Sequence, residues 1–269
     1  MTRRNMVGCL RMSLRLVLVL AWTLPCMPVQ AVFLTRPGLA KVRFAQIYWR
    51  GVAFIMGLRI TVKGEISPQR PIIFIANHCT WLDIVALGAV LPGCFVAKAD
   101  IARWPFISWI AKLGRTVFVS RNKATVERER DYLAARLAAG DNIILFPEGT
   151  TSDGRRVLPF QSSFLAIAQA SSKPVIQPVT IVYDQLDGLP VQRWDRPVIS
   201  WYGDMDIASH YPGIGKRTSL GATVIIDPAI PAGTFANRKI LSNALEARLA
   251  GNAARLRQGR DAGPKELAP

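Results

Sequence analysis

The chain has 269 residues, half of them hydrophobic and only 19% charged, and its 34 Lys and Arg against 18 Asp and Glu give a formal net charge of +16. This length can bury a sizeable core in one large domain or two small ones, and the basic excess predicts an anionic partner, either a membrane surface or a nucleic acid. The sequence contains no zinc-finger, RNP or basic-zipper pattern, and its first 64 residues combine apolar runs with Lys and Arg but no Asp or Glu, so we expect a membrane and no nucleic acid.

Cysteine usage argues against a metal centre and against a disulfide framework. The cysteines form no C-x-x-C pair, and none stands at metal-ligand spacing from a histidine: they are Cys9, Cys26, Cys79 and Cys94. The pattern predicts no metal site and fits a reducing cytosolic face.

The first predicted element is an apolar segment over residues 14–34, which approaches the ~20 residues that a bilayer crossing requires. Pro25 and Pro28 predict a kink, which allows a slanted or re-entrant insertion. A signal peptide is the alternative, because residues 29–31 resemble a cleavage site. Positive charges that discourage export follow at once: Arg36, Lys41 and Arg43. We expect a retained membrane anchor.

Residues 38–58 mix aromatic and cationic side chains, which suits a helix at the level of the lipid headgroups or a helix packed on the domain. We therefore assign residues 1–57 to a membrane anchor with interfacial helices, 58–258 to a single domain and 259–269 to a disordered tail.

From residue 58 onward, short strand patterns alternate with helix patterns. The predicted strands cover residues 58–62, 72–76, 94–97, 116–119, 142–146, 175–182, 198–202 and 222–226. The predicted helices cover residues 84–90, 100–103, 105–113, 124–139, 161–170 and 235–256. This alternation predicts an α/β fold with a mixed, partly parallel sheet flanked by helices.

Three of these strands end in polar residues. The strand over 72–76 leads to His78 and Asp83, the strand over 116–119 leads to Arg121, and the strand over 142–146 leads to Glu148, Gly149 and Thr150. Ligands of open α/β sheets gather beyond the carboxyl ends of the strands, so we expect these ends to converge on one pocket. Taken singly, Arg121 also reads as a solvated cation and the Glu148 segment as a plain turn.

His78 and Asp83 form a candidate catalytic pair. On one continuous helix they would lie about 140° apart, so they meet only if His78 stays in the turn and Asp83 lies in the first turn of the helix. The carboxylate then holds one imidazole nitrogen and leaves the other to take a proton. The alternative is a polar strand end with Asp83 at a helix start.

Four motifs stand in a fixed order along the chain. They are Asn77-His78-x-x-x-x-Asp83, Gly114-Arg115-Thr116-Val117-Phe118-Val119-Ser120-Arg121, Phe146-Pro147-Glu148-Gly149-Thr150 and Val175-Ile176-Gln177-Pro178-Val179. In this order the chain resembles the bacterial 1-acylglycerol-3-phosphate acyltransferase and lysophospholipid acyltransferase family, which includes lyso-ornithine lipid acyltransferases. The resemblance covers about residues 62–183.

The resemblance implies a membrane-bound O-acyltransferase that needs no cofactor. His78, oriented by Asp83, would remove the proton from the free hydroxyl of a lysolipid, which would attack the thioester of acyl-CoA or acyl carrier protein. Arg121, Glu148, Gly149 and Thr150 would position the acceptor. The implied reaction converts 1-acyl-sn-glycerol-3-phosphate to phosphatidic acid. The resemblance also implies that residues 58–258 are the acyltransferase domain, held at the inner (cytoplasmic) membrane with the active site facing the cytoplasm.

Two departures from the family pattern leave the acceptor open. Thr151 stands where family members with a phosphate acceptor often carry Arg, and Ser120 stands where they often carry Asp. The missing cation at position 151 weakens the case for a phosphate monoester and makes a zwitterionic acceptor such as lyso-ornithine lipid an equal alternative, although Arg155 and Arg156 offer substitutes. A catalytically silent lipid-binding protein is the non-enzyme alternative, and the intact pair of His78 and Asp83 argues against it. The absence of a G-x-S-x-G elbow disfavours a serine hydrolase.

Three further residues are assigned no catalytic role. We expect His210 to be a surface histidine with its hydrogen bonds satisfied, and Trp201 to serve packing alone. Cys79 is expected to be a buried filler rather than a nucleophile.

Overall fold

The computed structural model describes residues 3–104, 106–119, 126–169 and 174–267. The helices are α1 Arg3–Leu34, α2 Ala40–Met56, α3 Leu82–Val90, α4 Ile107–Leu113, α5 Val126–Ala138, α6 Arg196–Ile199, α7 Ile207–Gly215 and α8 Arg238–Arg257, with 3₁₀ turns η1 Ala99–Arg103, η2 Ser162–Gln169 and η3 Arg193–Asp195. The strands are β1 Leu58–Lys63, β2 Ile72–Ala76, β3 Cys94–Lys98, β4 Val117–Val119, β5 Ile143–Leu145, β6 Val175–Leu186, β7 Leu189–Pro190, β8 Leu220–Ile226 and β9 Ile230–Pro231.

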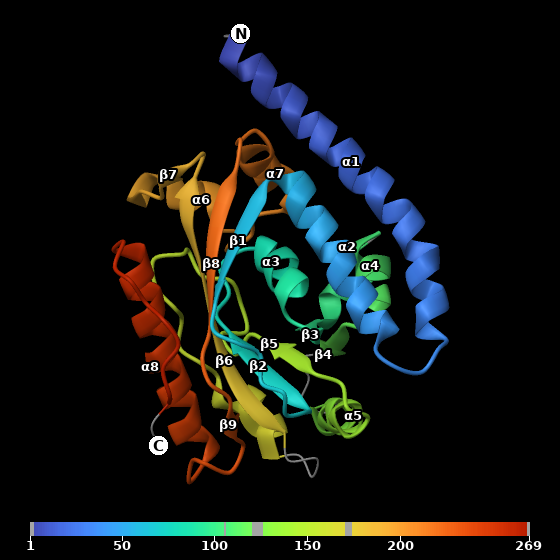
Figure 1. Cartoon of the computed structure of the whole chain (residues 1–269), viewed down its shortest axis with the longest axis vertical. Helices are drawn as coiled ribbons and strands as arrows, with labels where there is room; N and C mark the ends of the chain where they lie inside the picture. The colour runs from blue at the N-terminus through green and yellow to red at the C-terminus, as the bar shows by residue number, and fades with distance from the viewer. Residues whose placement is uncertain (1–2, 105, 120–125, 170–173, 268–269) are drawn as a thin grey trace.

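Within these ranges the strands form one sheet in the order β1-β8-β6-β2-β5-β3-β4, and β7 and β9 pair with β6 (Figure 1). Strand β2 runs parallel to both β5 and β6, and β3 runs parallel to β5 and β4. Strand β6 pairs antiparallel with β8, which is parallel to β1. The predicted α/β fold with a mixed, partly parallel sheet is therefore confirmed.

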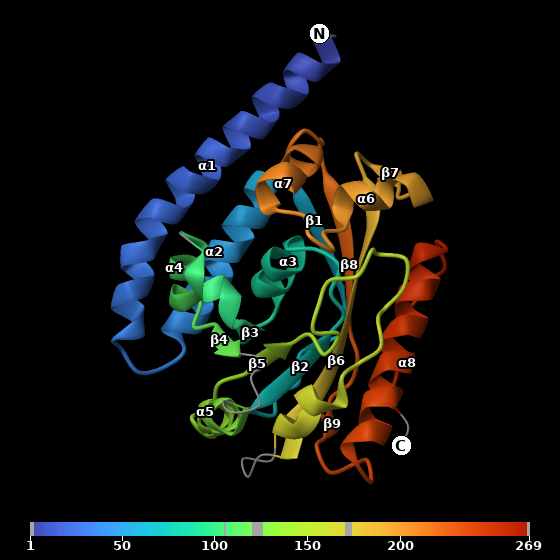
Figure 2. The same cartoon turned by 180° about the vertical axis from the view of Figure 1, so that it is seen from behind.

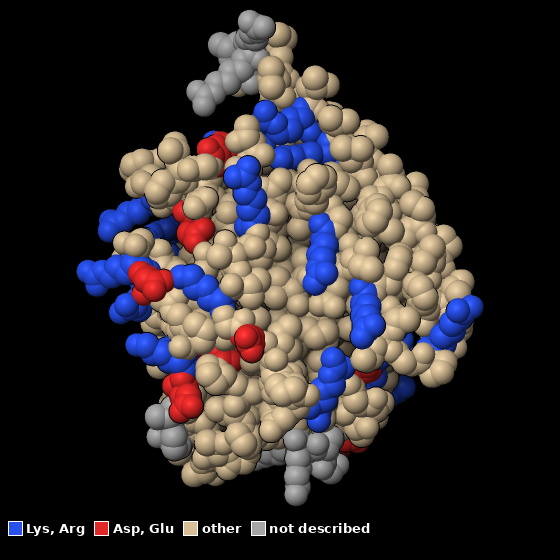
Figure 3. All heavy atoms as spheres, in the orientation of Figure 1, with Lys and Arg blue, Asp and Glu red and all other residues tan. Residues whose placement is uncertain are grey.

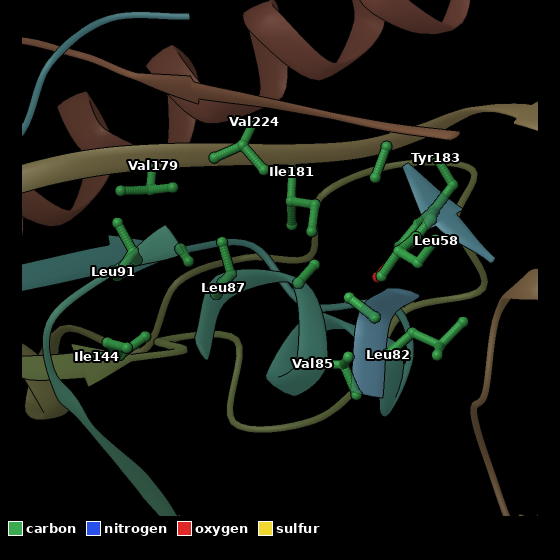
Figure 4. Close-up of a cluster of buried hydrophobic side chains, with 14 of the residues drawn as sticks. Leu58, Leu82, Val85, Leu87, Leu91, Ile144, Val179, Ile181, Tyr183 and Val224 are labelled. Carbon is green, nitrogen blue, oxygen red and sulfur yellow. The ribbon is translucent and has the colours of Figure 1, made fainter. Parts of the chain in front are cut away.

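Strand β2 is buried on both faces, as its unbroken apolar sequence requires. Side chains of Ile72, Phe74 and Ala76 face the helices α2 and α3, whereas those of Ile73 and Ile75 face α8. Figure 4 shows the first of these cores, in which α3 packs against the neighbouring strands β6 and β8. The sheet is thus covered on both sides, and its carboxyl-end loops are left for a site.

Helix α1 is continuous through Pro25 and Pro28 and lies along α2, with further contacts to α4 and α7 (Figures 1 and 2). The buried guanidinium of Arg15 donates to the carbonyls of Gly215, Arg217 and Thr218 at 3.3, 2.7 and 2.9 Å. Further along the helix, the Gln30 side chain donates to the carbonyl of Leu113 at 2.9 Å. Polar bonds therefore fix α1 to the domain from the middle of the helix to near its C-terminal end.

Two tryptophans continue this packing inward to α3. The Trp22 ring of α1 lies against Gly51 of α2, where a Cβ would come within 2.4 Å of the ring. The Trp49 ring of α2 lies equally close to Gly88 of α3. Only glycine permits such close approach, so the N-terminal helices and the helix that carries Asp83 form one packed unit.

Replacing Arg15 with methionine is expected to loosen α1, because three carbonyls lose a charged donor. Removing such bonds costs about 2–4 kcal/mol. We expect faster proteolysis within residues 35–39 and a lower unfolding temperature in detergent micelles. Arg11→Met is the control, because Arg11 makes a single exposed bond to the Lys216 carbonyl. Equal proteolysis of both variants and the unmodified chain would show that Arg15 does not hold α1.

The secondary structure predicted for the segment before α7 is wrong. Residues 198–202 are predicted as a strand, but Arg196–Ile199 is helix α6 and the rest is coil. Pro197 suits the first turn of a helix, and the Trp201 N–H donates to the Cys79 carbonyl at 2.9 Å instead of to a strand. Helix α7, which the sequence did not predict, is capped by the Asp206 carboxylate, and the helix expected over 161–170 is the 3₁₀ turn η2.

The chain beyond α8 contacts the domain, although its composition predicts a disordered tail. Ala262 is buried, and the fully buried Asp227 accepts the Lys265 N–H at 3.0 Å. Arg248 of α8 pairs with the same carboxylate through two nitrogens at 2.5 and 3.1 Å. A buried ion pair thus holds part of this segment against α8.

Candidate active site

The site is built on the residues that follow β2. The Asn77 side chain continues the pairing of β2 with β6, because its oxygen accepts the Ile181 N–H at 2.8 Å and its nitrogen donates to the Ile181 carbonyl at 2.9 Å. A side-chain amide here takes the place of a backbone peptide group. It fixes the direction in which the chain leaves the sheet and presents His78.

The structure brings His78 and Asp83 together. His78 lies in the turn, and Asp83 lies in the first turn of α3, with 2.8 Å between Nδ1 and Oδ2. The carboxylate is fully buried, whereas the His78 side chain keeps 16% of its exposure. Asp83 occupies Nδ1 and so leaves Nε2 as the nitrogen that can take a proton from another molecule.

Three further donors complete the surroundings of Asp83. Oδ2 accepts the backbone N–H groups of Cys79 and Thr80 at 2.7 and 3.0 Å, and Oδ1 accepts the Tyr183 hydroxyl at 2.9 Å. Burial, reinforced by the negative charge of Asp83, raises the pKa of Tyr183 well above its ordinary value, so this phenol stays a donor. Four hydrogen bonds compensate the buried charge.

One face of the His78 imidazole ring is covered by aromatic side chains. The ring stacks on Phe146 with ring centroids 4.1 Å apart and an interplanar angle of 15°, and Phe146 stacks in turn on Phe95. Beside the ring, burial raises the pKa of the Cys79 thiol well above its ordinary value, so Cys79 is no nucleophile. The ring is therefore held on one face and by one nitrogen.

Glu148 ties the His78 turn to the loop that follows β5. Its Oε1 accepts the His78 N–H at 2.7 Å, and its Oε2 accepts the Leu158 N–H at 2.8 Å. A second link runs from the Ser152 N–H to the His78 carbonyl at 2.9 Å. Burial raises the pKa of Glu148 to about 8 against the opposing effect of both N–H bonds.

We expect Glu148→Gln to destabilise the domain by about 1–3 kcal/mol at pH 5, because the amide nitrogen must face one of the two backbone N–H groups. For a chain of this size the unfolding temperature should fall by about 2–10 °C. The folded pKa lies above the ordinary value of 4.5, so protonation stabilises the wild-type chain fully below pH 4.5, and this stabilisation is lost as pH rises through about 8.

The gap in unfolding temperature between wild type and Glu148→Gln should therefore narrow from pH 5 to pH 8.5. Other titrating groups cancel in this difference, which thermal unfolding in detergent measures directly. A gap that stays constant over this range would contradict the raised pKa of Glu148.

The other predicted acceptor-binding residues lie beside this loop or outside the described part of the chain. Gly149 has a positive φ of 67°, and a Cβ there would come within 2.8 Å of the Gln161 amide, so glycine is required. Thr150 is exposed next to it. Arg121 falls outside the described residues.

The expectation for His210 is wrong, because the side chain is buried rather than at the surface. Its Nδ1 accepts the Trp81 indole N–H at 3.1 Å, and burial lowers the pKa of the ring. Trp201, expected only to pack, also donates its backbone N–H to Cys79 next to the catalytic pair. Both residues support the His78 turn from the side of α7, which no local sequence signal indicated.

Comparison with known proteins agrees with this geometry. The sequence profile of the family described as Acyltransferase matches residues 59–182. The lyso-ornithine lipid O-acyltransferase of Brucella abortus is 34% identical over 251 residues, which cover 91% of this chain and 94% of that relative. The 1-acyl-sn-glycerol-3-phosphate acyltransferase of Neisseria meningitidis is 33% identical over 139 residues, which cover 51% and 54%.

A solved structure extends the likeness to the whole fold. The crystal structure of the 1-acyl-sn-glycerophosphate acyltransferase of Thermotoga maritima superposes with a TM-score of 0.71 at 19% identity, covering 96% of this chain and 99% of that one. At this identity the match shows the fold alone. Together with the identity shared with the Brucella relative over nearly its full length, it leads to one conclusion: this chain belongs to the acyltransferase family.

Proposed function

We propose that this protein is a lysolipid O-acyltransferase whose acceptor is lyso-ornithine lipid. The observation that carries the chemistry is the His78 ring, bonded through Nδ1 to a fully buried Asp83 and free to use Nε2 as a base. The acceptor assignment rests on the Brucella relative, which matches 91% of this chain, and on Thr151 in place of an arginine.

In the proposed reaction, Nε2 of His78 takes the proton of the acceptor hydroxyl as its oxygen attacks the thioester carbonyl. A new C–O bond forms, the tetrahedral intermediate collapses, and the C–S bond breaks. The thiolate leaves and takes the proton back from the imidazolium, whose positive charge Asp83 stabilises in the meantime. The ester, the thiol and the unchanged enzyme are the products.

Acyl carrier protein or coenzyme A supplies the thioester, which is a co-substrate, and no cofactor takes part. Gly149, Thr150 and Arg121 are proposed to position the acceptor. Glu148, whose two oxygens are engaged by backbone N–H groups, acts through the His78 turn.

The membrane side is proposed to be the outer surface of α1 and α2. Helix α1 is long and apolar enough to cross a membrane, and large apolar side chains face away from the domain on both helices, among them Leu10, Val17, Leu24 and Phe54. Lys and Arg are spread over the same face (Figure 3). Because Arg15 and Gln30 bind α1 to the domain, the two helices are proposed to lie in the cytoplasmic leaflet of the inner membrane.

A panel of acceptors tests the proposed function. The purified protein in mixed micelles is supplied with labelled acyl thioester and either lyso-ornithine lipid or 1-acyl-sn-glycerol-3-phosphate. We expect labelled ornithine lipid as the main product, with acyl carrier protein and coenzyme A thioesters compared as donors.

Three other results would contradict the proposal. Phosphatidic acid as the main product would favour the phosphate acceptor, which the Neisseria relative represents. Free fatty acid alone would indicate hydrolysis. Lipid binding without any product would indicate a catalytically silent protein.

A further inference from the structure

Arg257, the last residue of α8, lies beside the loop that Glu148 holds. The half-buried side chain donates from Nη1 to the Arg155 carbonyl at 3.1 Å. Arg155 belongs to the segment 152–156, whose first residue donates its N–H to the His78 carbonyl. Helix α8 covers the sheet face opposite α3, and its C-terminal end reaches the carboxyl-end loops beside α6 (Figure 2). Arg257 is thus one short loop away from His78.

Among the described residues, Arg257 has no ion-pair partner. Of the carboxylates in the described ranges, none lies within 4 Å of it. Burial lowers its pKa, and the groups whose charges act on it are Cys79, Arg196, Glu148 and Asp153. Cys79 is a neutral thiol, and neither Glu148 nor Asp153 forms an ion pair with Arg257 within 4 Å.

A half-buried guanidinium without a carboxylate partner is available to bind an anion, and partial burial strengthens that attraction. Arg196 of α6 adds a second positive charge to the same region. Guanidinium binds planar oxyanions through two parallel N–H groups, which makes a carboxylate or a phosphate the fitting ligand.

The dimensions of the proposed acceptor agree with this position. In lyso-ornithine lipid, five bonds separate the hydroxyl-bearing carbon from the carboxylate carbon, which places them ~6 Å apart when extended. A hydroxyl at Nε2 of His78 therefore leaves the headgroup carboxylate ~6 Å from the reacting carbon, which is on the scale of the one short loop between His78 and Arg257.

We propose that the guanidinium of Arg257 binds the headgroup carboxylate of the acceptor lipid, which makes Arg257 a specificity-determining residue contributed by the C-terminal helix. This inference rests on the proposed function and names the group that recognises the anionic part of the headgroup. It assigns recognition to a residue 179 positions away from the catalytic base.

The test pairs a change in the enzyme with a change in the lipid. In the wild-type enzyme, converting the headgroup carboxylate of lyso-ornithine lipid to its methyl ester should raise the acceptor KM by about 10- to 100-fold. Arg257→Gln should raise the KM for the natural acceptor by a similar factor and add no further penalty for the methyl ester. The KM for the acyl donor should change by less than about 3-fold.

Two more variants separate binding from folding. Arg257→Lys keeps the charge without the two-pronged geometry and should give an intermediate KM. Arg260→Gln removes an equal charge from an exposed position three residues further on and should leave the KM unchanged. Unfolding temperatures of all variants are compared, because Arg257 also holds the Arg155 carbonyl.

The outcomes distinguish this inference from the proposed function. If wild type esterifies lyso-ornithine lipid but the methyl ester penalty persists in Arg257→Gln, Arg257 has only a structural role and the inference is overturned. If wild type esterifies only 1-acyl-sn-glycerol-3-phosphate, the acceptor assignment itself is wrong, and the carboxylate role of Arg257 goes with it. A penalty that vanishes only in the Arg257 variants supports both.

Discussion

Replacing His78 with alanine is expected to lower the kcat/KM of acyl transfer by about 10²- to 10⁴-fold, the range that a positioned general base contributes. The structure supplies the reason, because Asp83 fixes Nδ1 and leaves Nε2 as the proton acceptor. The His78 backbone N–H, which binds Glu148, is retained in the variant, so the loop should keep its path. The measurement is the initial rate of labelled ester formation in mixed micelles.

Added imidazole provides the control for this variant. A free base that enters the vacated space should restore part of the rate in His78→Ala and leave the wild-type rate unchanged. Ester formation by His78→Ala at a rate close to that of wild type would rule out His78 as the base, whatever the geometry of its ring.

Asp83→Asn is expected to lower kcat by about 10²- to 10⁴-fold while the fold persists. The asparagine oxygen can still accept the bonds of His78 Nδ1, Cys79 N–H and Thr80 N–H, and the Tyr183 hydroxyl can rotate to accept from the amide nitrogen. Only the negative charge is lost, so the imidazolium that forms during proton transfer loses its counter-charge. The measurement is kcat with an unfolding temperature for each variant.

Two further substitutions separate the effect of the Asp83 charge from the effect of its hydrogen bonds. Tyr183→Phe removes one donor to Oδ1 and keeps the charge, so its kcat should fall far less than that of Asp83→Asn. Asp83→Ala leaves several buried donors unpaired and should destabilise the fold by about 3 kcal/mol or more. Equal kcat values for Asp83→Asn and wild type would show that the charge of Asp83 does not assist transfer.

The local parts of the site were predictable from the sequence because they lie within a few residues of one another. The apolar run of β2 ends at Asn77, and the spacing from His78 to Asp83 fits only a turn followed by a helix start. Alternating strand and helix patterns likewise gave the fold class. In each case the signal and the structure it predicts occupy the same short stretch of chain.

The distant partners were not predictable, because they depend on which strands become neighbours. Tyr183 reaches Asp83 only because β6 pairs with β2 and runs on beyond its end, which places Ile181 beside Asn77 and Tyr183 two residues further on the same face. The period-two pattern of β6 would have indicated that face had the strand order been known. Arg257 is a hundred residues from the loop it touches, and no spacing pattern connects the two.

The strand assigned to residues 198–202 failed for a different reason. Short runs of β-branched and aromatic residues suit strands and buried coil equally well. Here Pro197 starts a helix, and the backbone of Trp201 binds the His78 turn instead of a sheet. Tertiary contacts therefore outweighed the strand preference of residues 198–202, which lie beside the His78 turn.

The way α1 is attached to the domain bears on how this enzyme can be handled in the laboratory. Deleting residues 1–34 would remove more than an apolar helix, because this helix also packs against the domain. The deletion would uncover Gly51, against which the Trp22 ring packs, and it would leave the carbonyls of Gly215, Arg217 and Thr218 without their donor. Replacing exposed apolar side chains such as Leu10 and Leu24 with polar ones should improve solubility. These substitutions leave α1 packed against the domain.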